Sequence, residues 1–264
     1  MTFNIKNILK ILPKHSVFRL IIYLISKGKS IYTDDLVLKK RGFNFLEKNF
    51  ESLPEIKNLV SIIEKEMGNK DSELLKSKKA KIAYRRLINA SNVKVYDKKF
   101  FQIINPDELS WWPKNLSKES FELLFKEKIV NNLEFEIDDI RVYCSKPEKK
   151  GDRQPLHIDT YENNEYKIFV YLTDCLQIEK GPFMYYPKSH NNMLLRKIIS
   201  IIISFFKKDH HTQMQYSFKE KDCHAVMGKI GTTFIFSTWG VHGGSTAPRD
   251  NSSRWSAVCT FKKV

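Results

Sequence analysis

Three residues in the second half of the chain could bind one metal ion together. His157 and Asp159 are separated by one residue in a segment typical of a strand end, so their side chains point to the same side, because strand side chains alternate between two faces. His242 follows the apolar run Thr232 to Trp239 and can supply a third ligand. Two imidazoles and one carboxylate on one side of an ion leave the opposite positions open for chemistry. These residues therefore predict a catalytic metal site.

Short β-rich runs surround these residues and must position them. From about Leu133 the segment LEFEIDDIRVYCS alternates apolar and polar residues. Five further runs follow, separated by Gly, Pro and Asn signals: YKIFVYL, PFMYYP, AVMGKI, TTFIFSTW and RWSAVCTF. Several short strands without intervening helices predict an antiparallel sandwich or barrel.

The part of the chain before this β region carries helical signals. Helices are predicted between Pro54 and Met67, from Ser72 to about Ile88, and from Ser117 to about Asn131. We therefore expect a mainly β protein with N-terminal helices. Residues 1–132 would form a helical and basic region packed on the core, and residues 133–264 would form the core itself.

One apolar segment interrupts the predicted strands. Met193 to His211, an insertion at about residues 192–212, is apolar over most of its length, with basic residues near both ends. It is too long for a tight turn and too short to span a bilayer, which takes about 20 residues. Three alternatives remain open: a helix docked on the barrel, a segment that dips into a membrane interface, or a lid over the active site.

The charge balance favours an anionic partner. Lys and Arg number 45 against 30 Asp and Glu, which gives a formal net charge of +15. Nucleic acid, a phosphorylated substrate and lipid headgroups would all satisfy this preference. Residues 1–50 are basic and amphipathic, so they either pack on the domain or lie on an anionic membrane.

The cysteines and the N-terminus indicate the compartment. Cys144, Cys175, Cys223 and Cys259 form no CxxC pair, which is typical of reduced, buried thiols in a cytoplasmic protein. The longest early apolar run, Leu20 to Ile25, is too short to cross a bilayer. We expect no cleaved signal and no transmembrane helix, and a cytoplasmic location, either free or peripheral to the inner face of a membrane.

An ordered set of motifs carries a family resemblance over residues 140 to 262. These motifs are His157-Ile158-Asp159, the GPFMYYPKSH turn from Gly181 to His190, Gly231-Thr232 opening a strand that leads to His242, and then Asn251 and Arg254. The set resembles the phytanoyl-CoA dioxygenase family of iron(II)- and 2-oxoglutarate-dependent oxygenases. The resemblance implies a double-stranded β-helix, a cupin-like jelly roll with the metal in its mouth.

The resemblance also implies roles for individual residues. His157, Asp159 and His242 would bind iron(II), and Arg254 would bind the cosubstrate 2-oxoglutarate, because the family's arginine follows the second histidine by about a dozen residues. Arg254 and Ser256 share one strand face and can point into the mouth together. Arg249 is the competing arginine, but it lies in a polar loop. Tyr171 aligns with a position that lines the cosubstrate pocket, although a tyrosine in an aromatic strand is more often core.

The implied reaction consumes O2 and 2-oxoglutarate and hydroxylates a C–H bond, and the carboxylate of Asp159 argues against halogenation. The leading substrate is a small anionic or membrane- or envelope-associated molecule: a lipid, an acyl group or a sugar. A soluble metabolite is the first alternative. The second is a non-catalytic basic module that binds nucleic acid or protein, which the intact ligand set disfavours.

Overall fold

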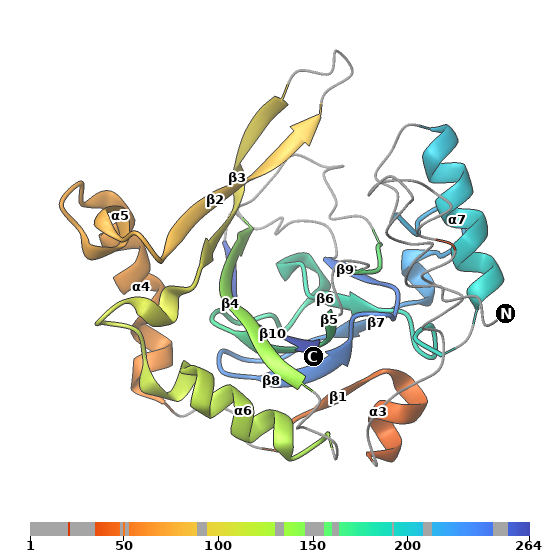
Figure 1. The fold of residues 1–264 in the computed structure, drawn as a ribbon, viewed down its shortest axis with the longest axis horizontal. Helices are drawn as coiled ribbons and strands as arrows, with labels where there is room; N and C mark the ends of the chain where they lie inside the picture. The colour runs from red at the N-terminus through yellow and green to blue at the C-terminus, as the bar shows by residue number, and fades with distance from the viewer. Residues whose placement is uncertain are drawn as a thin grey trace, which may run out of the picture.

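The protein is built around two antiparallel β-sheets that face each other. The computed structural model describes residues 21, 35–47, 50, 53–88, 94–129, 135–145, 156–159, 164–191, 193–207, 213–244 and 253–264. Figure 1 shows the sheets at the centre, with α4 and α6 on one side and α7 on the other. The mainly β fold predicted from the sequence is confirmed.

The larger sheet has seven strands in the order β1-β8-β5-β10-β4-β3-β2. Their bounds are Phe43–Phe45 (β1), Lys81–Ile88 (β2), Lys94–Ile104 (β3), Phe135–Ser145 (β4), Asn164–Tyr171 (β5), Thr233–Ser237 (β8) and Arg254–Lys263 (β10). The smaller sheet has the order β7-β6-β9, with β6 at Phe183–Tyr185, β7 at His224–Val226 and β9 at His242–Gly244. Each of the six β-rich runs predicted from the sequence overlaps one of these strands.

Alternation along the strands gives the larger sheet two different faces. On β10, Trp255, Ala257 and Cys259 are buried in the main core, whereas Arg254 and Ser256 line a pocket on the other face. This follows from the two-residue period of a strand. The face that carries Trp255 packs against the helices, and the opposite face turns toward the smaller sheet.

Two of the predicted helices cover the core face of the larger sheet. α4 (Pro54–Gly68) begins with Pro54 in its first turn, and α6 (Lys118–Lys126) is capped by the side chain of Ser117, which accepts a hydrogen bond from Ser120 N. Leu59 and Ile63 from α4 and Phe121 from α6 enter the main core. α3 (Leu36–Arg41) precedes β1.

The helix predicted from Ser72 to about Ile88 is wrong. Only α5 (Glu73–Lys76) is helical, and Lys81–Ile88 forms β2, which pairs with β3. Dense lysines suggested a solvated helix, but Lys81–Ile88 pairs with β3 from its first to its last residue, and pairing with a neighbouring strand outweighs the local preference. β1, β2 and β3 therefore extend the same sheet as the strands after residue 133, and a boundary at 132/133 stays a prediction.

The apolar insertion contains α7 (Leu194–Phe206), a helix docked at the edge of the smaller sheet. Among the described helices, none has the length and apolar character needed to cross a membrane. Of the basic segment 1–50 the structure describes residues 21, 35–47 and 50, and the rest of that segment lies outside the described residues. Arg249 and Asn251 also lie outside them.

Candidate metal centre and adjoining pocket

Backbone pairing brings the three predicted ligands together from distant parts of the sequence. His157 and His242 exchange two backbone hydrogen bonds, with N···O distances of 2.7 and 2.9 Å. Asp159 N donates to Thr238 O at 3.1 Å, which holds the carboxylate residue beside the strand that precedes His242. β9, which begins at His242, pairs with β6. The smaller sheet and its extension through His157 thus position all three side chains.

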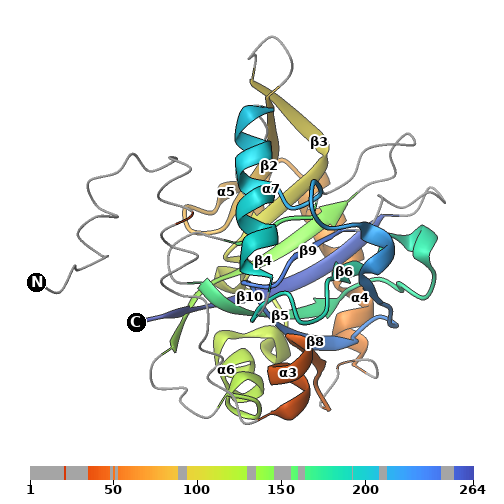
Figure 2. The same cartoon turned by 90° about the vertical axis from the view of Figure 1, so that its right-hand side faces the viewer.

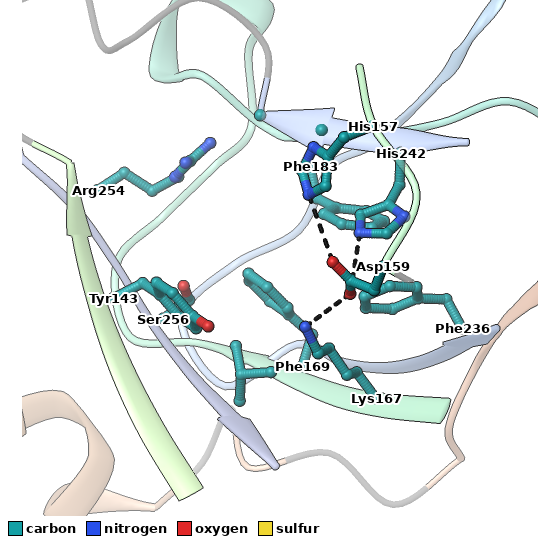
Figure 3. Close-up of a pocket in the computed structure, with 13 residues that line it drawn as sticks. Tyr143, His157, Asp159, Lys167, Phe169, Phe183, Phe236, His242, Arg254 and Ser256 are labelled. Atoms are coloured by element: carbon teal, nitrogen blue, oxygen red, sulfur yellow. Dashed lines mark hydrogen bonds and ion pairs between the residues drawn. The ribbon is translucent and has the colours of Figure 1, made fainter. Parts of the chain in front are cut away.

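The ligand atoms of His157, Asp159 and His242 all lie within 4.8 Å of one another. His157 Nε2 is 3.6 Å from Asp159 Oδ1, and His242 Nε2 is 3.4 Å from Asp159 Oδ2. Figure 3 shows the carboxylate pointing between the two imidazoles. In the part of the chain that the structure describes, no other group of three or more His, Cys, Asp or Glu side chains has this geometry.

The environment of His242 fixes its ring. Its Nδ1 lies 2.8 Å from the carbonyl oxygen of Gly240 and donates to it, which leaves Nε2 as the ring nitrogen that faces Asp159. Such a hydrogen bond to the second ring nitrogen is typical of metal-binding histidines. The ring lies 5.6 Å from that of Phe183 and 5.0 Å from that of Phe236, measured between centroids. His242 is therefore held by packing as well as by hydrogen bonding.

A lysine that sequence reasoning did not assign to the site contacts the carboxylate. Lys167 Nζ lies 2.7 Å from Asp159 Oδ2. Burial alone would raise the pKa of Asp159, but attraction to Lys167, His242 and His157 outweighs it and holds that pKa well below its ordinary value. Burial likewise opposes the charge on Lys167, yet the attraction of Asp159 raises the pKa of Lys167. Both groups are therefore charged at neutral pH.

A pocket with a cavity volume of about 120 Å³ opens beside the three ligands, between the two sheets. The pocket is lined by polar and aromatic side chains from both sheets: Tyr143, His157, Asp159, Lys167, Phe169, Phe183, Phe236, His242, Arg254, Ser256 and Val258, with Gly243 and Gly244.

Arg254 and Ser256 both line this pocket, as their shared strand face predicts. Figure 3 shows Arg254 across the pocket from the two histidines and Asp159. Its guanidinium donates to Gly181 O and, at 3.2 Å, to Ser145 Oγ. These two contacts aim a buried cation at the pocket while leaving part of its donor fork for a ligand.

Tyr171 lies behind the pocket wall and is not among the residues that line the pocket. Its hydroxyl donates to Val226 O at 2.6 Å and accepts a hydrogen bond from Phe183 N at 2.9 Å. Burial raises the pKa of Tyr171 far above its ordinary value, so it stays neutral. Tyr171 therefore affects the pocket only indirectly, by holding the backbone of Phe183, whose ring packs beside His242.

Sequence reasoning missed Lys167, Tyr143 and the aromatic wall. A signal for Lys167 was present, because it shares the β5 face of Tyr171 and is a single cation in the apolar run YKIFVYL. Tyr143 and Phe236 carried no comparable signal. Their position depends on which face of β4 and β8 turns toward the smaller sheet.

No protein-family profile matches this sequence, and no curated protein sequence matches it. Solved structures are similar in fold at low identity. AviO1 from Streptomyces viridochromogenes Tue57 has a TM-score of 0.55 at 15% identity, over 86% of this chain and 91% of AviO1. HygX from Streptomyces hygroscopicus, with nickel, 2-oxoglutarate and hygromycin B bound, has a TM-score of 0.55 at 13% identity, over 86% of this chain and 85% of HygX.

The epimerase SnoN, in complex with Fe3+, α-ketoglutarate and nogalamycin RO, has a TM-score of 0.53 at 11% identity. The similarity covers 86% of this chain and 80% of SnoN. Such identities establish the fold and leave activity to be argued from the site. The chain therefore shares the double-stranded β-helix fold of these structures, of which those of HygX and SnoN hold a metal ion and 2-oxoglutarate.

Proposed function

We propose that this protein is an iron(II)- and 2-oxoglutarate-dependent dioxygenase that hydroxylates a C–H bond of a small substrate. One observation carries the proposal: His157, Asp159 and His242 converge at the edge of a pocket that also holds the buried cation Arg254. Two imidazoles and one carboxylate on one side of an ion are the donor set of non-haem iron(II) oxygenases. The site therefore fits the metal by ligand type, number and placement.

The residues divide into three roles in this proposal. His157, Asp159 and His242 hold the metal. Arg254 binds the distal carboxylate of 2-oxoglutarate with the free part of its guanidinium fork, and Ser256 lies beside it on β10. Tyr171 supports the cosubstrate pocket indirectly by fixing the backbone of Phe183. When bound, iron(II), 2-oxoglutarate and O2 supply the oxidising power that converts a C–H bond to an alcohol.

The pocket walls suit this chemistry. Phe169, Phe183 and Phe236 surround the ligand cluster with apolar surface, which limits the number of water molecules beside the metal and strengthens the attraction between Arg254 and an anion. Lys167 compensates the charge of Asp159 inside this apolar setting. The bound hygromycin B and nogalamycin RO in the similar folds support a small-molecule substrate.

The substrate class follows from charge. We propose that the substrate is anionic or is associated with a membrane or the cell envelope, such as a lipid, an acyl group or a sugar. The protein would bind it at the cytoplasmic face of a membrane. The net charge of +15 supports this. The same chemistry on a soluble metabolite is the alternative. A non-catalytic basic module is the second alternative, and salt-dependent binding to RNA or DNA without metal-dependent turnover would favour it.

The test is an anaerobic titration of the full-length protein with iron(II) and 2-oxoglutarate, followed by visible absorption. The expected result is a metal-to-keto-acid charge-transfer band in the parent. His157→Ala should abolish the band, and Arg254→Ala should raise the 2-oxoglutarate concentration required by at least about tenfold. Arg254→Lys keeps the charge without the planar fork, so the 2-oxoglutarate concentration that it requires should lie between those of the parent and Arg254→Ala. A parent that binds metal but shows no band would contradict the proposal.

A further inference from the structure

α7 carries its polar residues toward the protein and its apolar residues toward solvent. The side chains of Lys197, Ser200 and Ser204 are buried, together with that of Ile201. The opposite face is exposed at Leu195 (70%), Ile199 (42%), Ile202 (37%), Phe205 (47%) and Phe206 (77%). A surface helix normally shows the reverse arrangement. We call these five exposed residues the outer face of α7, and Figure 2 shows the helix standing in front of the sheets.

The buried polar residues lock this orientation. Lys197 Nζ donates to Trp239 O at 2.6 Å, and Ser200 Oγ donates to Met214 O at 2.9 Å. Ser217 N donates to Ser200 Oγ at 3.1 Å. Rotating the helix to hide its apolar side would break all three hydrogen bonds and expose Ile201, so the outer face is a fixed feature of the fold.

A second copy of the chain is a poor occupant for this face. The 13 residues of α7 extend for about 20 Å, so a strip about 10 Å wide offers about 200 Å². A standard protein interface uses about 800 Å² from each partner. Two copies would also bring together chains that each carry a formal charge of +15, which repel each other.

An anionic bilayer surface fits the face better in size and in charge. Insertion of one helix face needs no matching protein surface, and it removes the apolar side chains from water. The segment Leu194–Lys207 contains no acidic residue. At its end, Lys207 is exposed and lies 5.1 Å from the ring of Tyr216, a cation and an aromatic group at the level where lipid headgroups would lie.

We propose that the outer face of α7 inserts into the headgroup region of an anionic lipid bilayer, with the helix axis parallel to the membrane plane. A 13-residue helix is too short to span, since spanning takes about 20 residues, but it suits an interfacial position about 5–10 Å deep. Lys197 ties this helix to the carbonyl of Trp239, three residues before His242. Docking therefore places the bilayer next to the segment that carries a predicted metal ligand.

The test measures binding of the metal-free, full-length protein to vesicles, so its outcome is independent of the proposed oxygenase activity. Phosphatidylcholine vesicles are compared with vesicles that also contain phosphatidylglycerol, by cosedimentation at low and moderate salt. The parent should bind the anionic vesicles at low salt and dissociate from them as the salt concentration rises. Leu195→Ser/Phe206→Ser should weaken binding at least about tenfold. Leu75→Ser/Leu123→Ser, which changes exposed leucines on α5 and α6, should bind as the parent does.

A second measurement locates the contact. Brominated lipids should quench the added tryptophan of Phe206→Trp more strongly than that of Leu123→Trp, each compared with the parent. Circular dichroism melts must show that the serine variants fold. Three results would overturn the proposal: no binding of the parent to anionic vesicles at low salt, unchanged binding of Leu195→Ser/Phe206→Ser, or a dimer in sedimentation velocity that this variant abolishes.

Discussion

The ammonium group of Lys167 lies 2.7 Å from Oδ2 of Asp159, the carboxylate that stands between His157 and His242. The contact joins β5 of the larger sheet to the loop that carries two of the three predicted ligands. It fixes the orientation of the carboxylate and engages one of its oxygens, which favours metal binding through the other oxygen alone. It also places a cation near the metal position, so two opposing effects act on metal affinity.

Lys167→Met should weaken metal binding by about 10–100-fold, the usual cost of removing a group that orients a metal ligand. The loss of orientation and a higher pKa of Asp159 both act in this direction, and they outweigh the relief of charge repulsion. Calorimetric titration with Co(II) or Ni(II) measures the change without any turnover. Lys167→Arg, which keeps the cation, should bind metal more tightly than Lys167→Met. Equal or tighter binding by Lys167→Met would show that repulsion dominates.

Much of the site was predictable from the sequence because local patterns encode it. The spacing of His157 and Asp159 places both on one side of a strand end, and the alternation in RWSAVCTF sends Arg254 and Ser256 into the same pocket. The GPFMYYPKSH motif contains β6, which pairs with the strand of His242. In the first two cases a period of two residues was enough to choose the face.

The remainder depends on contacts between distant segments. The charged segment Lys81–Ile88 becomes a strand because β3 is available to pair with it. No pattern within the segment itself predicts that pairing. The outward apolar face of α7 depends on Trp239 and Met214, whose carbonyls accept its buried polar groups. The hydroxyl of Tyr171 points away from the pocket lining because Val226 and Phe183 supply its hydrogen bonds.

Tyr171→Phe should cost about 1–3 kcal/mol of unfolding free energy, because Val226 O and Phe183 N lose a buried hydrogen-bonding partner. Its effect on 2-oxoglutarate binding should be smaller than that of Arg254→Ala, since Tyr171 acts only through Phe183. Urea unfolding and the anaerobic titration measure the two effects. A loss of cosubstrate affinity as large as that of Arg254→Ala, without a loss of stability, would instead show direct contact with the cosubstrate.

His190 should make the fold sensitive to mild acid. Burial lowers its pKa from 6.5 to about 4, and its Nε2 donates to Lys39 O at 3.0 Å. Because the folded pKa lies below the unfolded one, the unfolded state binds more protons between these values, and stability falls as the pH drops from 6.5 toward 4. Between pH 7 and pH 5 the parent should lose about 2 kcal/mol more than His190→Gln, which keeps a donor for Lys39 O. Urea melts at both values measure this difference, and parallel losses would rule it out.

Gly240 should be intolerant of any side chain, and the consequence should reach the metal site. A Cβ atom at this position would lie 1.7 Å from the hydroxyl oxygen of Tyr185, a fully buried side chain that has no room to withdraw. The carbonyl of Gly240 also accepts the hydrogen bond from His242 Nδ1. Gly240→Ala should therefore cost about 1–3 kcal/mol of stability, and it should weaken Co(II) binding by displacing His242.

Gly68→Ala is the matched control for this change. A Cβ atom at Gly68, the last residue of α4, meets nothing within 4 Å, so this variant should keep its metal affinity and gain up to about 1 kcal/mol from reduced freedom of the unfolded chain. Thermal melts and Co(II) titrations of both variants make the comparison. If Gly240→Ala lost stability but bound Co(II) like the parent, the segment before His242 would have adjusted without moving the ring. The hydrogen bond to Gly240 would then not be what positions this ligand.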